Sequence, residues 1–273
     1  MLRLLLLSAT AMGAFAANSL LCRLALQHGS IDPASFTSLR VASGALMLAA
    51  IVALRRGPPR PATPADWPAA AALWAYMVGF SFAYLTLPAG TGALILFGAV
   101  QLTMFSAGLR AGERFAPAAW GGLGLAVAGL LYLVSPGLSA PEPLGAALMA
   151  GAGVAWGLYS LRGRRATDPL AASAGNFLRA VPLALLVSAA TLARWHADTT
   201  GAALAVASGA LTSGLGYVVW YAALPGRTAM RAATLQLSVP PLAALGGVWL
   251  LGEALSPRLV LASGAILGGI ALA

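Results

Sequence analysis

The chain has 273 residues, of which 60% are hydrophobic and only 8% are charged, whereas about a quarter of the residues in an average soluble domain are charged. This composition excludes an ordinary water-soluble fold. The net charge is +9, but all sixteen basic residues are arginines in scattered positions. No basic stripe interleaved with aromatic residues is present, so nucleic-acid binding is not indicated. The single cysteine excludes disulfides within the chain.

Apolar stretches follow one another along the whole chain. A helix needs roughly 20 apolar residues to cross the hydrocarbon core of a bilayer. Turn-forming segments such as Ser135-Pro136-Gly137 separate the stretches. The sequence predicts ten transmembrane helices, at residues 3–25, 33–54, 67–86, 89–109, 115–135, 143–161, 169–193, 201–222, 228–251 and 257–273.

The arginines predict the orientation of these helices, because short cytoplasmic loops are enriched in positive charge. With the N terminus inside, eleven arginines lie on the cytoplasmic side, and only Arg23, Arg194 and Arg258 lie on the other side. We therefore expect both termini to be cytoplasmic.

The two halves of the chain resemble each other. Shifts of 137 to 140 residues align Arg23 with Arg162, Arg40 with Arg179, Gly79 with Gly216, Leu87-Pro88 with Leu224-Pro225, and Gly112-Glu113 with Gly252-Glu253. Each unit contains five spans, an odd number, so the second copy is expected to be inverted in the membrane. We predict one repeat at residues 1–137 and the inverted repeat at 138–273. Such repeats are typical of secondary transporters, whose substrate site lies near the midplane.

A Leu-Pro-x-x-Thr motif opens the fourth span and a Gly-Glu motif closes it, and both recur in the second half. With five plus five spans, the whole chain resembles the ten-helix EamA-type transporters of the drug/metabolite transporter superfamily. Its length and aromatic content most resemble the YddG-type exporters of aromatic amino acids. The resemblance implies an all-α membrane protein with two inverted five-helix repeats around a central cavity. It also implies a bacterial inner (plasma) membrane location, a small-molecule substrate, a monomer or homodimer, and neither a cofactor, a metal nor nucleic acid as partner.

In that family the third, fourth, eighth and ninth helices line the cavity together with parts of the first and sixth. Aromatic and polar side chains gather on one face of several of these helices, at spacings of three and four residues. The alternatives are lipid-facing or interfacial rings, and a purely structural hydrogen bond for the buried amide. The candidate substrate-binding residues are Phe15, Asn18, Met77, Phe80, Tyr84, Phe97, Gln101, Trp156, Tyr159, Tyr217, Trp220, Tyr221 and Pro240.

Two features interrupt the apolar pattern inside spans. Pro240-Pro241 removes backbone donors in the middle of the ninth span and frees carbonyls near Gln236 and Leu237, for substrate binding or for helix packing. Arg40 and Arg179 are the only charges well inside spans, and each is a candidate to meet a substrate carboxylate. Snorkelling to the interface is the favoured interpretation, because the second and seventh helices are peripheral in the family.

All seven acidic residues are predicted in loops or at helix ends. Proton-driven carriers commonly need a titratable group in the pathway, so we predict alternating access without obligatory proton coupling. An aromatic cavity with few charges suits neutral or aromatic amino acids. A proton-coupled exporter of drugs or planar organic cations is the alternative, since ring faces attract cations. No metalloprotease or serine-hydrolase motif is present, so the chain is not expected to be an enzyme.

Overall fold

The computed structural model describes residues 2–55, 66–137, 139–163, 166–223 and 236–272, and these residues are nearly all helical. Among them, seven helices are long and apolar enough to cross a membrane, judged by length and composition. Three shorter apolar helices, at Trp67–Ala83, Val239–Leu251 and Pro257–Leu272, complete the ten predicted spans. The prediction of an all-α membrane protein is confirmed.

The helices follow the predicted order along the chain. Those of the first half are α1 (Leu2–Gln27), α2 (Pro33–Ala53), α3 (Trp67–Ala83), α4 (Ala89–Arg110) and α5 (Pro117–Val134). Those of the second half begin with α6 (Pro143–Gly163), α7 (Pro169–Ala190), the short 3-10 helix η1 (Leu192–Arg194) and α8 (Thr199–Ala207). They continue with the π-helix η2 (Ser208–Leu215), α9 (Gly216–Ala223), α11 (Val239–Leu251) and α12 (Pro257–Leu272).

Two predicted spans are not regular helices. The eighth widens into the π-helix η2 in its middle, which the sequence pattern did not indicate. In the ninth, residues 228–235 lie outside the described part, and Leu237 and Ser238 form a turn before α11 begins. Pro240 and Pro241 lie in the first turn of α11, where a missing backbone N–H costs no helical hydrogen bond. The predicted interruption near Leu237 is therefore present.

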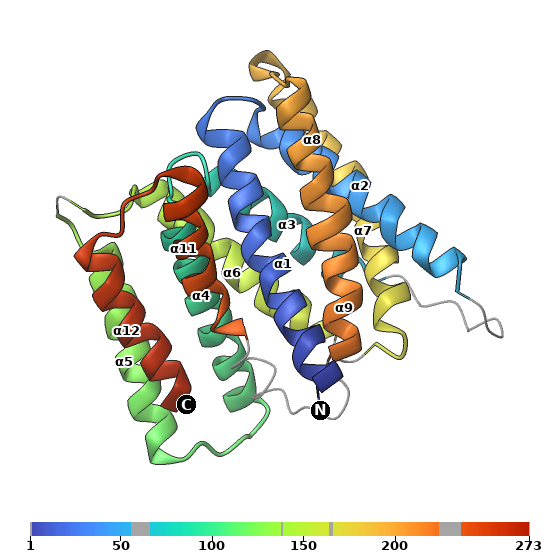
Figure 1. Cartoon of the computed structure of the whole chain (residues 1–273). Coiled ribbons are helices and arrows are strands. Elements are labelled where there is room, and N and C mark those ends of the chain that lie inside the picture. Colours follow the sequence, from blue (N-terminus) through green and yellow to red (C-terminus); the bar gives the residue numbers. More distant parts are fainter. Residues whose placement is uncertain (1, 56–65, 138, 164–165, 224–235, 273) are drawn as a thin grey trace.

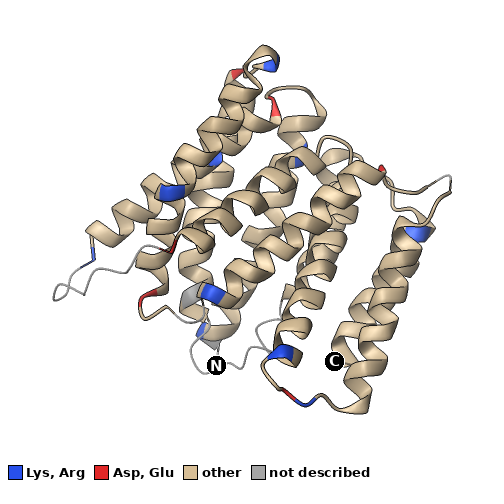
Figure 2. Cartoon of the chain, turned by 180° about the vertical axis from the view of Figure 1, so that it is seen from behind, with Lys and Arg blue, Asp and Glu red and all other residues tan. Residues whose placement is uncertain are grey.

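Acidic side chains stabilise the helix starts. An aspartate precedes each of α2, α3, α7 and α8, and its carboxylate accepts hydrogen bonds from amides of the first turn. Glu142 does the same for α6, accepting from the amides of Leu144 at 2.8 Å and Gly145 at 2.5 Å. Figure 2 shows the acidic residues at helix ends and connections, as predicted.

The recurring Gly-Glu motif ends a helix in both halves. Gly112 after α4 and Gly252 after α11 have φ angles of 80° and 66°, a left-handed conformation that glycine adopts without strain. The amides of Glu113 and Glu253 then donate back to carbonyls of the preceding helix, each at 3.0 Å. The motif therefore stops the helix and turns the chain.

Helices that the predicted repeat aligns with each other pack together in three cases. Helix α2 packs against α7, α4 against α11, and α5 against α12, while α3 packs against α6 and α1 against the α8–η2–α9 span (Figure 1). The start of α1 and the end of α12 lie on the same side of the molecule (Figure 1). We call this the N side, and the opposite side the far side.

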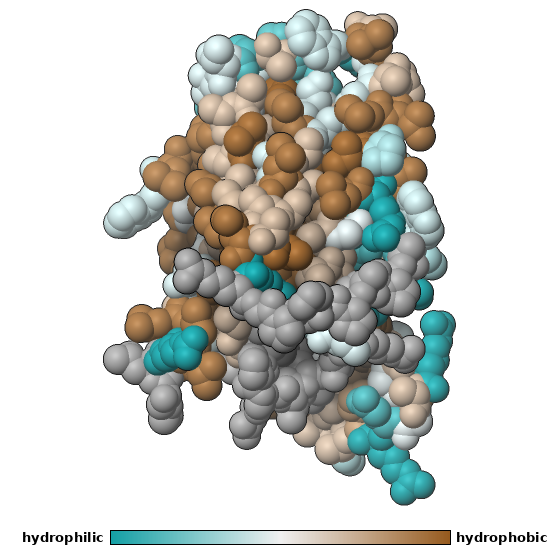
Figure 3. Space-filling model, turned by 90° about the vertical axis from the view of Figure 1, so that its right-hand side faces the viewer, coloured by the Kyte–Doolittle hydropathy of each residue, from teal (hydrophilic) through white to brown (hydrophobic). Residues whose placement is uncertain are grey.

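The outer surface is largely apolar. Large hydrophobic side chains such as Leu46, Leu186 and Trp249 are exposed, and hydrophobic residues cover much of the face in Figure 3. A surface of this kind suits contact with lipid tails, where the helical backbone is satisfied internally. The buried aromatic side chains gather instead in the middle of the helix bundle.

Candidate functional site

Aromatic rings from three helices meet in the middle of the molecule. The ring of Phe15 on α1 lies 6.2 Å from Trp156 on α6, 6.2 Å from Tyr217 and 5.9 Å from Trp220, both on α9. Trp156 also contacts Tyr217, with 5.3 Å between centroids. All four side chains are buried. We call these rings, together with Tyr76, Phe80 and Tyr159, the ring cluster.

Tyr76 connects α3 to this cluster. Its ring lies 4.9 Å from Trp156 and 5.4 Å from Phe80, and Tyr159 lies 5.6 Å from Trp156 on the other side. Phe80 on the third span is therefore linked to Tyr217 on the eighth span through Tyr76 and Trp156. Sequence reasoning missed Tyr76, although a tyrosine one helical turn before Phe80 was the signal that could have found it.

A polar network crosses the ring cluster. The Asn18 Oδ1 atom accepts hydrogen bonds from the hydroxyls of Ser208 at 2.6 Å and Thr212 at 3.2 Å. Its Nδ2 atom donates to the Tyr76 hydroxyl oxygen at 3.4 Å. Both hydroxyl residues belong to η2, and π-helical turns recur at functional sites. The network thus joins α1, α3 and η2 at the level of the rings.

The prediction that Arg40 snorkels to the interface is wrong, because its side chain is 0% exposed. Its Nε donates to Ser213 Oγ at 3.2 Å and its Nη2 to the Tyr76 hydroxyl at 3.0 Å. Its guanidinium carbon lies 4.8 Å from the centre of the Phe80 ring. The physical reason is that η2 packs directly on α2, with Gly209 against the Arg40 carbonyl, and turns this face of α2 inward.

The repeat-related Arg179 behaves differently. It is only half-buried, and its guanidinium lies beside Gly175, one turn nearer the N-side end of α7. This conformation is the one expected for an arginine that reaches toward an interface.

The central cavity is small in this conformation. Its volume is about 20 Å³, which is room for a single water molecule. A solute of amino-acid size therefore needs the surrounding helices to move apart. The walls are formed by Phe15, Asn18, Ser19, Arg40, Tyr76, Phe80, Leu96, Phe97, Trp156, Thr212, Ser213 and Tyr217.

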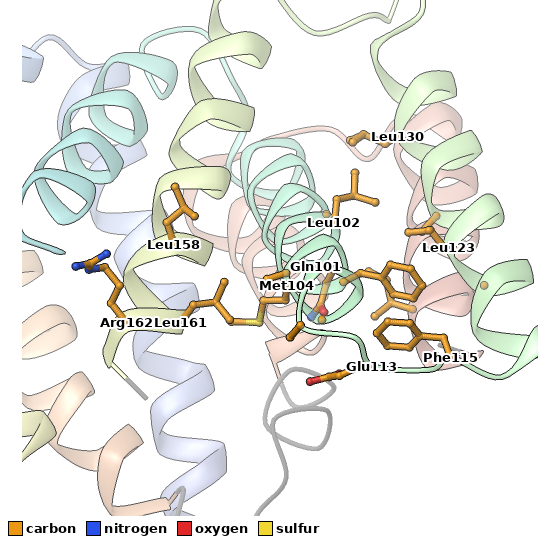
Figure 4. Close-up of a pocket in the computed structure, with 18 of the residues that line it drawn as sticks. Gln101, Leu102, Met104, Glu113, Phe115, Leu123, Leu130, Leu158, Leu161 and Arg162 are labelled. Atoms are coloured by element: carbon orange, nitrogen blue, oxygen red, sulfur yellow. The ribbon is translucent and has the colours of Figure 1, made fainter. Parts of the chain in front are cut away.

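A second cavity of about 660 Å³ lies on the N side, beside the second half of α4. Gln101 and Met104 of α4 face it, with Phe115 and Leu123 on one side and Leu158 of α6 on the other (Figure 4). Phe97 lines the central cavity, and Gln101, one turn further along α4, lines the N-side cavity. Helix α4 therefore runs from one cavity to the other.

An ion pair on the far side, which we call the far-side lock, joins the two halves of the chain. Arg23 Nε donates to Glu253 Oε1 at 3.1 Å, and Arg23 Nη1 donates to the carbonyls of Tyr84 at 2.9 Å and Leu85 at 3.1 Å. The other Glu253 oxygen accepts from the Ala89 amide at 2.8 Å. The lock thus ties α1 to the α3–α4 and α11–α12 connections.

The loops on the far side also join. Ile31 and Ala197 form an antiparallel bridge, and the Asp32 amide donates to the His196 carbonyl at 2.8 Å. The α1–α2 and α7–α8 connections are therefore hydrogen-bonded to each other.

On the N side, the two residues that the predicted repeat aligns with the far-side lock are apart. Arg162 corresponds to Arg23 and Glu113 to Glu253, and both line the N-side cavity at separate places on its wall (Figure 4). Arg162 instead donates to the Asp66 carboxylate at 3.0 Å. Burial raises the pKa of Asp66, but hydrogen bonds from Arg162 and the Ala69 amide outweigh it, and the pKa lies below its ordinary value.

Some candidate residues lie away from the central cavity. Tyr84 belongs to the far side, where its hydroxyl donates to the Ala89 carbonyl at 3.2 Å. Met77 and Pro240 are buried without lining either cavity. The side chain of Tyr221 lies outside the described part of the structure. The candidates at the ring cluster or the central cavity are Phe15, Asn18, Phe80, Phe97, Trp156, Tyr159, Tyr217 and Trp220.

In a comparison with known protein families, residues 143–273 match the EamA-like transporter family. The chain is 59% identical to an uncharacterized protein of Pseudomonas aeruginosa, over 99% of this chain and 94% of that protein. It is 36% identical to the threonine/homoserine exporter RhtA of Escherichia coli K12 over 118 residues, 41% of this chain and 39% of that protein. A crystal structure of a further protein superposes with a TM-score of 0.66 over 97% of both chains at 24% identity, which shows a shared fold.

Proposed function

We propose that the chain, whose residues 143–273 match the EamA-like transporter family, is a transporter of that family that exports aromatic and other neutral amino acids by alternating access, without obligatory proton coupling. The observation that carries the proposal is the buried ring cluster around Phe15 and Trp156, crossed by the polar network at Asn18. Rings bind flat apolar side chains by stacking and edge contacts, and a few convergent polar groups fix orientation.

The similarity to RhtA supports an amino-acid type of substrate, because RhtA is a threonine/homoserine exporter. The proposed preference for aromatic side chains rests on the ring cluster. In that respect the YddG-type exporters are the functional analogy that we propose, although none of the proteins compared above is named as one.

The absence of acidic residues at the centre supports transport without proton coupling. Among the described residues, no carboxylate lines the central cavity, and an ionisable group in the pathway is the usual device of proton-coupled carriers. The alternative, a proton-coupled exporter of planar cations, is disfavoured because a cationic solute would meet the buried charge of Arg40.

Alternating access is supported by a difference between the two sides, because among the described residues the repeat-aligned Arg–Glu ion pair is formed on one side only. We propose that residues 1–137 and 138–273 are inverted repeats, so that each side of the membrane carries one copy of the same pair. The far-side pair Arg23–Glu253 is formed, while its counterpart Arg162–Glu113 flanks the N-side cavity. In the opposite state, Arg162 and Glu113 would pair and the far-side lock would open.

The proposed location is a bacterial inner membrane with both termini in the cytoplasm. This orientation makes the N side cytoplasmic and puts its cavity in reach of cytoplasmic metabolites. It is supported by the arginine distribution, of which Arg3, Arg55, Arg110, Arg114 and Arg162 belong to the described N side. Arg56, Arg60, Arg164, Arg165, Arg227 and Arg231 lie outside the described residues.

Uptake of radiolabelled tryptophan into liposomes containing the purified protein tests the proposal. We expect saturable uptake with no ion gradient, competition by phenylalanine, and no change in initial rate when a pH gradient is imposed. Protein-free liposomes are the control. Uptake that begins only with a proton gradient would contradict the uncoupled mechanism, and no uptake of any amino acid would contradict the substrate class.

A further inference from the structure

Arg40 is a buried positive charge that the proposed function has not yet explained. It lies on α2 at the level of the ring cluster, and its side chain is fully buried. Two of its nitrogens are hydrogen-bonded, to Ser213 and Tyr76, but Nη1 has no hydrogen-bond partner among the described residues. No described carboxylate forms an ion pair with it.

Such an arginine is unfavourable unless something compensates it. Buried charges in proteins are paired or fully hydrogen-bonded, because desolvation of the ion is costly. The rings of Phe80 and Tyr76, at 4.8 and 5.3 Å from the guanidinium carbon, offset part of this cost. They leave the Nη1 hydrogens without an acceptor, so the side chain is ready for an anion.

Tyr76 supplies a second donor at the same place. Its oxygen accepts from Arg40 Nη2 at 3.0 Å and from Asn18 Nδ2 at 3.4 Å. These two bonds occupy both lone pairs, and the O–H hydrogen is left to donate. Arg40 and Tyr76 both line the central cavity. A guanidinium beside a hydroxyl donor is a common arrangement for binding a carboxylate.

We propose that Arg40 and Tyr76 bind the carboxylate of the transported molecule, and that this carboxylate, not an ammonium group, is the charge the site requires. This inference rests on the proposed function, because it assigns the substrate class at the same central cavity. The solute must enter after the helices separate, since the present cavity is too small for it.

The cavity offers an ammonium group no negatively charged acceptor among the described residues. Asn18 Oδ1 accepts hydrogen bonds from Ser208 and Thr212, and no described acidic residue lines the cavity. An ammonium group therefore meets ring faces and neutral hydroxyls but no carboxylate, and it lies near the like charge of Arg40. The substrate class consequently extends to aromatic monocarboxylates without an amino group.

Competition against labelled phenylalanine uptake tests this selectivity. The compound 3-phenylpropionate keeps the carboxylate and lacks the ammonium, whereas phenethylamine keeps the ammonium and lacks the carboxylate. We expect 3-phenylpropionate to compete with phenylalanine. Phenethylamine should have no effect even at about a hundredfold higher concentration than 3-phenylpropionate, because it lacks the carboxylate that forms charge-assisted hydrogen bonds with the site. Equal competition by phenethylamine would overturn the inference.

A binding measurement separates this inference from the proposed function. Scintillation proximity with radiolabelled 3-phenylpropionate reports binding to the purified protein even if no amino acid is transported. Arg40→Gln should weaken binding by about thirtyfold or more, and Tyr76→Phe, which keeps the ring, by about fivefold. Arg179→Gln is the matched control and should bind as the wild type does.

The outcomes are distinct. If the wild type transports phenylalanine but Tyr76→Phe and Arg40→Gln bind 3-phenylpropionate as the wild type does, the carboxylate site is overturned and the proposed export function stands. Binding without amino-acid transport would keep the site and overturn the exporter. Should Arg40→Gln fail to fold, Tyr76→Phe and Arg40→Lys decide, because Lys keeps the charge but loses the planar donor pair.

Discussion

Replacing Glu253 by glutamine removes the negative charge of the far-side lock and keeps a side chain of the same length. In the native protein both side chains of the lock are mostly buried, with 17% exposure for Arg23 and 12% for Glu253. The glutamine oxygen still accepts from the Ala89 amide, so the main loss is the charge-assisted bond to Arg23. Such bonds contribute about 1.5–3 kcal/mol.

A loss of about 2 kcal/mol from the closed state corresponds to about a thirtyfold increase in the population open to the far side. The native Cys22 is a ready reporter of this opening. It is the only cysteine, it is fully buried, and it precedes Arg23 in the chain. We therefore expect Glu253→Gln to increase the rate of Cys22 modification by a membrane-impermeant maleimide about thirtyfold.

Glu142→Gln is the matched control, because it makes the same chemical change on the same side of the molecule. Glu142 caps α6 and forms no ion pair among the described residues. Cys22→Ser measures background labelling, and an unchanged melting temperature excludes unfolding as the cause. A labelling rate in Glu253→Gln equal to that of the wild type would refute the idea that the lock holds the far side closed.

Three further outcomes follow from the structure. Gly153→Ala should destabilise the protein by about 1–3 kcal/mol, because the new methyl would lie 2.5 Å from a carbonyl oxygen of α4. The control Gly151→Ala places its methyl in open space and should not destabilise the protein. Thermal unfolding in detergent compares the two variants, and equal melting temperatures would contradict the close packing at Gly153. Trp156→Leu should raise the KM for tryptophan about tenfold, because it removes ring contacts in the ring cluster. Trp120→Leu, which changes an exposed side chain on α5, should leave the KM unchanged. An unchanged KM in both variants would show that the ring cluster does not bind the substrate. Asp66 has a pKa below its ordinary value of 3.8, so its stabilising effect is complete above pH 3.8 and is lost as the pH falls through the lowered pKa. Acid should therefore reduce the melting temperature less in Asp66→Asn than in the wild type. Identical pH profiles of the melting temperature would contradict the ion pair with Arg162.

The predictable parts of the fold are those encoded by neighbouring residues. Helix starts follow from an aspartate that caps the first turn, and the ends of α4 and α11 follow from Gly112 and Gly252. The interruption of the ninth span follows from Pro240 and Pro241. Each of these signals acts within one helical turn, so no knowledge of packing is needed to read it.

The inward-facing side of each helix is harder to predict, because membrane helices are apolar all round. The pattern marked Arg40 as a charge inside the second span but did not show which way its side chain points, which is decided by the approach of Gly209 on η2. It grouped Tyr84 with the central candidates, although α3 ends at Ala83 and Tyr84 lies at the far side. It also missed Tyr76, which joins the rings to the polar network.

The cap on α4 has a consequence for the order of events during biosynthesis. The Ala89 amide at the start of α4 is hydrogen-bonded to Glu253, which lies 164 residues later in the chain. Helix α4 is therefore synthesised long before the side chain that completes its first turn. Its far-side end acquires this hydrogen bond only after Glu253 has been made, so the cap on a helix of the first half waits for a residue of the second half.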